Sequence, residues 1–215
     1  ESHAPRGTES ANAERLHASV LMAGRPALSV AWSPERAVSK SLLDENVRLT
    51  RAVQLIKLGA RMAVLEAETA LSHERLVRLY KEVTGKSPSR GQLPYSTDWY
   101  TSWQPNIHAS LFMNLYENLN KATVVDPADL LVKAWQLYAE DIAVMGAEPI
   151  LTITRAWRLV KFVDSDMLCL TPCTRCGGHF VTHTHEYGAG FKPFVCGLCG
   201  QPARAGKGRR EGAIH

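Results

Sequence analysis

The 215-residue sequence lacks any long hydrophobic run: no stretch approaches the roughly 18 uncharged apolar residues that a membrane-spanning helix needs. The apolar segment 20–24 is too short for the core of a secretory signal, and Arg25-Pro26 ends it. No charge of one sign dominates, since 25 Lys and Arg oppose 21 Asp and Glu. With 45% hydrophobic and 21% charged residues, the composition is typical of a folded protein. We therefore expect a soluble, cytoplasmic protein with no membrane partner.

Catalytic motifs are also missing: the sequence has no P-loop, no G-x-G-x-x-G and no H-E-x-x-H. The segment Pro172-Cys173-Thr-Arg-Cys176 matches half of the zinc-deaminase signature, but no H-x-E precedes it. No residue pattern that would activate a nucleophile is recognisable. We therefore predict that the protein is not an enzyme and has no catalytic residues.

Cysteine is absent from the first 168 residues, and all five cysteines follow within the last quarter of the chain. That quarter is also basic: residues 155–215 hold nine Lys or Arg against four Asp or Glu, whereas residues 1–154 hold 16 against 17. This asymmetry suggests a polyanionic partner, although a solubilising tail would give the same pattern. Clustered cysteines without a signal peptide indicate a reducing compartment and a metal site rather than a disulfide scaffold.

Two C-x-x-C pairs, separated by 19 residues, are the strongest motif. Each pair can direct two sulfurs at one ion, and four sulfurs complete the tetrahedral shell of zinc. An iron–sulfur cluster also takes four thiolates, but two well-separated pairs favour zinc. Because four cysteines close the shell, the predicted Zn²⁺, one per chain, is structural. Its ligands are predicted to be Cys173, Cys176, Cys196 and Cys199.

The segment between the cysteine pairs is predicted to be a small ribbon-like hairpin over the metal. Its first strand would cover 179–183, and its return strand 191–195. A module of this size buries little apolar surface, so metal binding would supply most of its folding free energy. Cys169, ahead of the first pair, is expected to be a spare buried thiol.

The fold class is predicted to be mainly α. Residues 41–71 carry two neighbouring apolar stripes at helical spacing, broader than one partner helix needs. We expect one long helix here, buried on two sides or offering one side to another subunit. Further helices are predicted over 73–84, 106–121, 127–143 and 149–163. The predicted organisation is a flexible N-terminal extension (1–41), an all-helical partner- and DNA-binding domain (42–165), a zinc-binding module (166–201) and a basic flexible tail (202–215).

The segment 73–84 combines helical spacing with three cations. Ser72 precedes it as a candidate N-cap, and Gly85 would terminate it. A long helix, a three-residue turn and a short cationic helix match the outline of a helix-turn-helix, although an ordinary solvated surface helix has the same pattern. Three cationic sets are therefore candidates for DNA contact: Arg75, Arg78 and Lys81; Arg155, Arg158 and Lys161; and, on the tail, Arg204, Lys207, Arg209 and Arg210.

Six segments add a more specific signal: LGAR at 58–61, LEAET at 65–69, LVRLYKE at 76–82, LPYSTDW at 93–99, TRAW at 154–157 and CGGHF at 176–180. With the two cysteine pairs, they resemble the FlhC family of flagellar master transcriptional regulators over about residues 48–200. The resemblance implies a mostly helical fold with a zinc site made by the four cysteines. It also implies a heterohexamer of four FlhD and two FlhC chains that binds promoter double-stranded DNA and recruits RNA polymerase to activate flagellar operons.

In that family, the broad apolar face of 41–71 would be a candidate for the FlhD or intersubunit contact. The alternative function is that of a zinc-ribbon protein that binds RNA or serves as a scaffold. It would share the cysteines and the basic tail, but it gives no reason for the helical segments to match the family.

Overall fold

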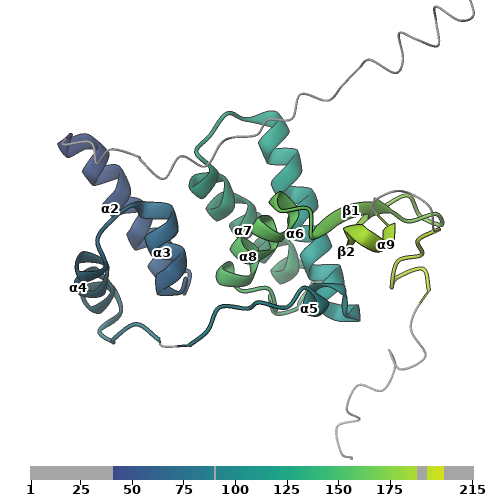
Figure 1. Cartoon of the computed structure of the whole chain (residues 1–215), viewed down its shortest axis with the longest axis horizontal. Helices are drawn as coiled ribbons and strands as arrows, with labels where there is room; N and C mark the ends of the chain where they lie inside the picture. The colour runs from purple at the N-terminus through teal and green to yellow at the C-terminus, as the bar shows by residue number, and fades with distance from the viewer. Residues whose placement is uncertain (1–40, 90, 188–192, 201–215) are drawn as a thin grey trace, which may run out of the picture. The chain divides into compact units, whose positions relative to one another are not determined.

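The computed structural model describes residues 41–89, 91–187 and 193–200 (Figure 1). The mainly helical prediction is confirmed. The predicted N-terminal extension, except for Ser41, and the predicted basic tail lie outside the described residues. The elements are, in order, α2 (Leu42–Lys57), α3 (Met62–Thr69), α4 (His73–Thr84), α5 (Asp98–Thr101), α6 (Trp103–Ala122), α7 (Pro127–Val144), α8 (Ile153–Asp164), β1 (Leu168–Pro172), β2 (His179–His183) and α9 (Thr184–Tyr187).

The single long helix expected over 41–71 is wrong, because the chain breaks between α2 and α3. Gly59 has a φ of +77°, in the left-handed region that glycine adopts at little cost. After the break, the backbone N–H of Arg61 donates to Thr154 Oγ1 on α8, 3.1 Å away. Leu55 and Leu65 are nevertheless both buried, because the two helices cover the same core. The helical spacing of apolar residues therefore continues across the break, so this spacing could not predict it.

Buried side chains from every helix from α2 to α8 form one continuous apolar cluster, which we call the body core. Tyr100, Phe112 and Tyr138 are among its largest fully buried members. One charged group also lies within this packing: Arg51 of α2 is 7% exposed. It pairs with Asp129 at 3.0 Å and with Asp126 at 3.2 Å, and so connects α2 to the first turn of α7.

None of the helices in the described parts of the chain has both the length and the apolarity that a bilayer crossing requires.

The hairpin exists, but its predicted pairing is wrong. β2 pairs antiparallel with the preceding β1, with Leu168 opposite His183 and Pro172 opposite His179. Residues 193–195, in the expected return strand, have no strand structure. Leu168 and Val181 join the body core, which fixes the hairpin against the helices. The other edge of β2 lies against α6 (Figure 1).

Candidate metal centre

The first cysteine pair lies on a tight turn that begins where β1 ends. The N–H of Gly177 donates to the carbonyl of Cys173 at 2.8 Å. Gly177 has a φ of +72°, so the turn uses the left-handed conformation that glycine favours. The N–H of Cys173 donates to Gly178 O at 2.8 Å, which closes the base of the turn. This geometry directs the side chains of residues 173 and 176 toward the second pair.

The second pair lies on a similar turn. The N–H groups of Cys199 and Gly200 both donate to Cys196 O, at 3.1 and 2.9 Å. Two further bonds connect the turns: Thr174 N–H to Phe194 O at 2.9 Å, and Arg175 Nη1 to Cys199 O at 2.6 Å. The two turns, 173–178 and 193–200, are together called the cysteine region below.

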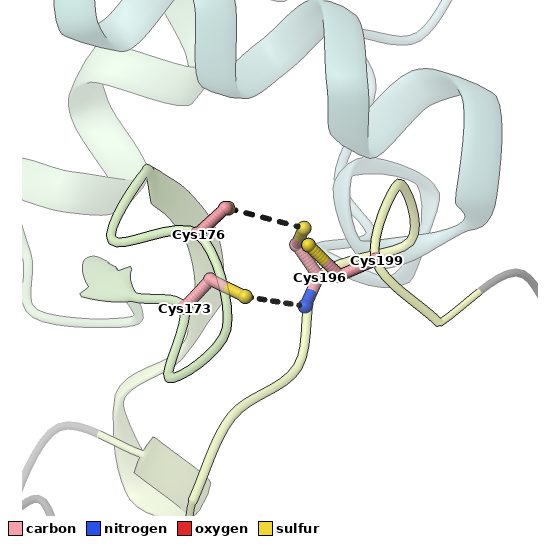
Figure 2. Close-up of side chains that lie close together, drawn as sticks. All are labelled: Cys173, Cys176, Cys196 and Cys199. Carbon is pink, nitrogen blue, oxygen red and sulfur yellow. Dashed lines mark hydrogen bonds between the residues drawn. The ribbon is translucent and has the colours of Figure 1, made fainter.

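Figure 2 shows the four side chains of the two pairs converging from the two turns. All four Sγ atoms lie within 4.8 Å of one another. The Sγ atoms of Cys176 and Cys196 are 3.8 Å apart. A tetrahedral zinc site with bonds of about 2.3 Å has sulfur–sulfur edges of about 3.8 Å. The sulfur positions therefore fit a four-coordinate metal, and they leave no ligand position open for a substrate.

Backbone N–H groups also prepare this site for anionic sulfur. Cys173 Sγ accepts from Cys196 N at 3.3 Å and from Arg175 N at 3.4 Å. The bond from the Cys196 N–H is the main cause that lowers the pKa of Cys173 to about 6. The S–H of Cys199 donates hydrogen bonds to the sulfurs of Cys196 and Cys176, which favours the neutral thiol and raises the pKa of Cys199 to about 12. Four sulfurs this close become thiolates together only when a cation compensates their charge, which a divalent metal does.

The first cationic set lies on α4. The helix α3, the turn 70–72 and α4 together have the outline of a helix–turn–helix, in which the first helix has eight residues. Ser72 and Gly85 flank α4 as expected, and Gly85 is left-handed. Arg75 forms an ion pair with Glu45 of α2. Arg78 and Lys81 are exposed, and within the described ranges neither pairs with a carboxylate.

The second set, on α8, is occupied by contacts within the molecule. The guanidinium carbon of Arg155 lies 3.9 Å from the ring centroid of Trp99. Arg158 Nε donates to Pro94 O at 3.1 Å, and Lys161 Nζ lies 4.0 Å from a carboxylate oxygen of Glu68. These cations hold the segment 93–99 and α3 against α8. The third set, Arg204, Lys207, Arg209 and Arg210, lies outside the described residues.

One contact of the metal centre was not anticipated from the sequence. Trp103, at the start of α6, donates its Nε1–H to Gly197 O at 3.1 Å. Gly197 lies between two of the cysteines, so α6 contacts the second turn directly. The only local signal was an aromatic residue close after the segment 93–99, which does not identify a partner 94 positions away.

Comparisons with known proteins give one consistent result. A family model described as "Flagellar transcriptional activator (FlhC)" matches residues 37–212. The chain is 56% identical over 179 residues to the flagellar transcriptional regulator FlhC of Verminephrobacter eiseniae, covering 83% of this chain and 95% of that protein. The protein of the same name from Thauera aminoaromatica is 50% identical, covering 80% and 87%. That from Xenorhabdus nematophila is 48% identical, covering 80% and 89%.

Proposed function

This chain belongs to the FlhC family of flagellar transcriptional regulators, and we propose that it activates flagellar operons by binding their promoter DNA together with FlhD and by helping to recruit RNA polymerase. The family consists of regulators rather than enzymes. The observation that carries the proposal is a family match that spans both the helical body and the cysteine cluster. A zinc-ribbon protein that binds RNA or serves as a scaffold would account for the cysteines alone. We place the regulator in the cytoplasm, where the promoters are.

The proposed cofactor is one structural Zn²⁺ per chain, held by Cys173, Cys176, Cys196 and Cys199. Two observations support zinc: an all-sulfur ligand set and an S–S distance that matches the edge of a zinc tetrahedron. When bound, the ion would neutralise the thiolates and join the two turns. The backbone N–H groups of Arg175 and Cys196 would continue to stabilise the Cys173 sulfur.

For the partner contact, we propose the exposed apolar start of α2. Leu42 is 81% exposed, Leu43 78% and Val47 54%, and they lie within two turns of one helix. Clustered apolar exposure of this kind is typical of a surface that another subunit covers. This face would contact FlhD in a heterohexamer of four FlhD and two FlhC-family chains.

A co-purification experiment tests this contact. We expect Leu43→Asp to abolish recovery of the chain with tagged FlhD, because a carboxylate would be buried in the interface. Val144→Asp is the matched control, since Val144 is also highly exposed and lies on a different helix, at the C-terminal end of α7. Equal recovery of both variants would contradict the assignment.

For DNA contact, we propose Arg78 and Lys81 as the leading candidates, because their charges are exposed and unpaired in the described ranges. Arg75 shares their helix but also pairs with Glu45. Arg155, Arg158 and Lys161 remain candidates, although binding DNA would require their present contacts to be shared or exchanged. Arg204, Lys207, Arg209 and Arg210 are proposed to follow the phosphate backbone.

A gel shift of a flagellar promoter tests the function as a whole, using the chain alone, with FlhD, and with FlhD and a zinc chelator. We expect tight, sequence-selective binding that requires both FlhD and zinc. Arg78→Ala should weaken binding by about 1–3 kcal/mol if the side chain reads a base. Lys57→Ala, an exposed cation at the end of α2, is the control. Failure on every promoter fragment, with binding to RNA instead, would support the zinc-ribbon alternative.

A further inference from the structure

The indole of Trp103 lies directly against the backbone of the second cysteine turn. Besides the hydrogen bond to Gly197 O, a Cβ atom added to Gly197 would lie only 2.6 Å from Trp103 Cδ1 and 3.1 Å from Nε1. The φ of Gly197 is not in the left-handed region, so its backbone conformation alone would tolerate alanine. Glycine is therefore required at 197 because the indole occupies the space of a side chain.

Farther along α6, three polar side chains bind the edge of β2. Asn106, Ser110 and Asn114 are spaced four residues apart and so lie on one face of the helix. Asn106 Nδ2 donates to Val181 O at 2.6 Å, Val181 N–H donates to Ser110 Oγ at 2.9 Å, and Asn114 Nδ2 donates to His179 O at 2.9 Å. These side chains satisfy backbone groups that a third strand would otherwise pair.

The cysteine region has little other support. Its two buried cysteines, Cys173 and Cys196, form a small cluster with Phe180 of β2, and Phe194 and Cys199 pack against this cluster. The turn 196–199 is therefore positioned from two sides, by the metal ligands on one side and by Trp103 on the other. When two contacts position the same segment, each stabilises the other, and the coupling is reciprocal.

We propose that Trp103 is a positioning residue for the metal. By holding the 196–199 turn through Gly197, it presents Cys196 and Cys199 to the ion, and metal binding in turn secures the docking of this turn on α6. This inference rests on the proposed metal site. It assigns to α6 the role of an outer contact of the metal centre, and such contacts commonly change metal affinity about 10- to 100-fold when removed.

A double-mutant cycle tests the proposal on the full chain co-purified with FlhD. The measured quantity is Zn²⁺ affinity, by competition with a chromophoric chelator. We expect Gly197→Ala to weaken Zn²⁺ binding about 10-fold or more, because its methyl group displaces the turn from the indole. Trp103→Ala should have a similar effect. In the Trp103→Ala background, Gly197→Ala should cause little further loss, because the clash is gone.

Two further variants separate positioning from general stability. Trp103→Phe keeps an aromatic ring but loses the Nε1–H, so it should weaken Zn²⁺ binding by less than Trp103→Ala. Trp135→Phe is the matched control: Trp135 Nε1 also donates to a backbone carbonyl, Leu151 O at 2.8 Å, but in the helical body. It should lower the thermal unfolding temperature without changing Zn²⁺ affinity.

Three outcomes would overturn the inference. Unchanged Zn²⁺ affinity in Trp103→Ala and Gly197→Ala would remove the coupling, as would independent, multiplicative effects in the double variant. A loss of Zn²⁺ affinity in Trp135→Phe equal to that in Trp103→Phe would reduce Trp103 to a general stabilising residue. Absence of Zn²⁺ from the wild-type complex would instead refute the metal proposal itself, so the two failures are distinguishable.

Discussion

In the helical body, the buried side chains form a continuous apolar cluster that extends from Ala52 on α2 to Phe162 on α8. At the cysteine region, the buried cluster consists of Cys173 and Cys196 together with Phe180 of the neighbouring β2. Burial of apolar area scales with the number of side chains removed from water, so the body has a large source of stability that the cysteine region lacks. One chain therefore contains two parts with different requirements: the helical part depends on its apolar core, and the cysteine region on the proposed metal and the docking contact with α6.

The largest expected effect is that of removing one ligand, by Cys173→Ser. Cys173 is buried and accepts two backbone N–H bonds, so its loss removes both a metal bond and the anion that these groups stabilise. We expect the variant to lose its metal. The cysteine region would then lose about 10 kcal/mol of the free energy that stabilises its folded structure. The helical circular dichroism signal should persist. Zinc content, circular dichroism and hydrogen exchange of 193–200 measure the three quantities.

Cys169→Ser is the control for this experiment. Cys169 lies on β1, outside the group of four converging sulfurs, and its sulfur contacts Thr171 and Thr182. It should retain the metal. If Cys173→Ser unfolds the helices as completely as the cysteine region, the division into two parts is wrong.

A cavity in the body core should instead destabilise the helices. Phe112 on α6 is fully buried, and Phe112→Ala should lower the free energy of unfolding by about 3–5 kcal/mol. Val144→Ala, at an exposed position, should change it by less than about 0.5 kcal/mol. Denaturant unfolding followed by circular dichroism measures both. A loss for Phe112→Ala no larger than that for Val144→Ala would show that the body core does not determine the stability of the body.

The two regions also differ in how much the sequence could predict. The four converging cysteines were identifiable because their geometry is local: two cysteines three positions apart on a turn can direct their sulfurs at one ion whatever the surrounding fold. The helices were identifiable from apolar spacing, which is also local. The α2–α3 break was not, because Gly59 interrupts the backbone without interrupting the spacing of buried residues.

Contacts between segments far apart in the chain could not be predicted from the sequence. The partner of β2 depends on which edge the body leaves available, and α6 already covers the other edge with Asn106, Ser110 and Asn114. Polar side chains in a helix are expected on the solvent face, so nothing in the spacing indicates a strand beside them. The internal contacts of Arg155 and Arg158 on α8 could not be predicted for the same reason, since their partners in 93–99 are brought to them only by tertiary packing.

A smaller effect is expected where α6 binds the edge of β2, which directly follows the first cysteine turn. Asn106 is 7% exposed and donates to both Tyr100 O and Val181 O. Asn106→Ala leaves these buried carbonyls without that donor, which should cost about 1–3 kcal/mol of unfolding free energy. Asn114→Ala, with a more exposed bond to His179 O, should cost less. Denaturant unfolding compares the two variants. An equal loss of unfolding free energy, or a larger loss for Asn114→Ala, would show that burial does not determine how much these hydrogen bonds between α6 and β2 stabilise the protein.

The smallest effect concerns pH and the opposite side of α6. His108 Nδ1 lies 2.7 Å from the Tyr138 hydroxyl, which itself accepts from Leu151 N–H at 3.2 Å. The Leu151 N–H uses a lone pair of the hydroxyl oxygen and leaves the hydroxyl proton free to donate to His108 Nδ1 when the imidazole is neutral. Burial lowers the pKa of His108 in the folded protein. The unfolded chain, with an ordinary histidine pKa of about 6.5, binds the proton more readily.

The unfolding free energy contributed by His108 should therefore be fully present above about pH 6.5 and should decrease as the pH falls toward the lowered folded pKa. Comparing unfolding free energies at about pH 7.5 and about pH 5.5 for the wild type and His108→Gln isolates this contribution, because acid release of the metal affects both proteins. We expect the wild type to lose more stability on acidification than the variant. An identical loss would mean that His108 contributes nothing to the acid sensitivity, and that its burial against Tyr138 does not make the helical part of the chain sensitive to pH.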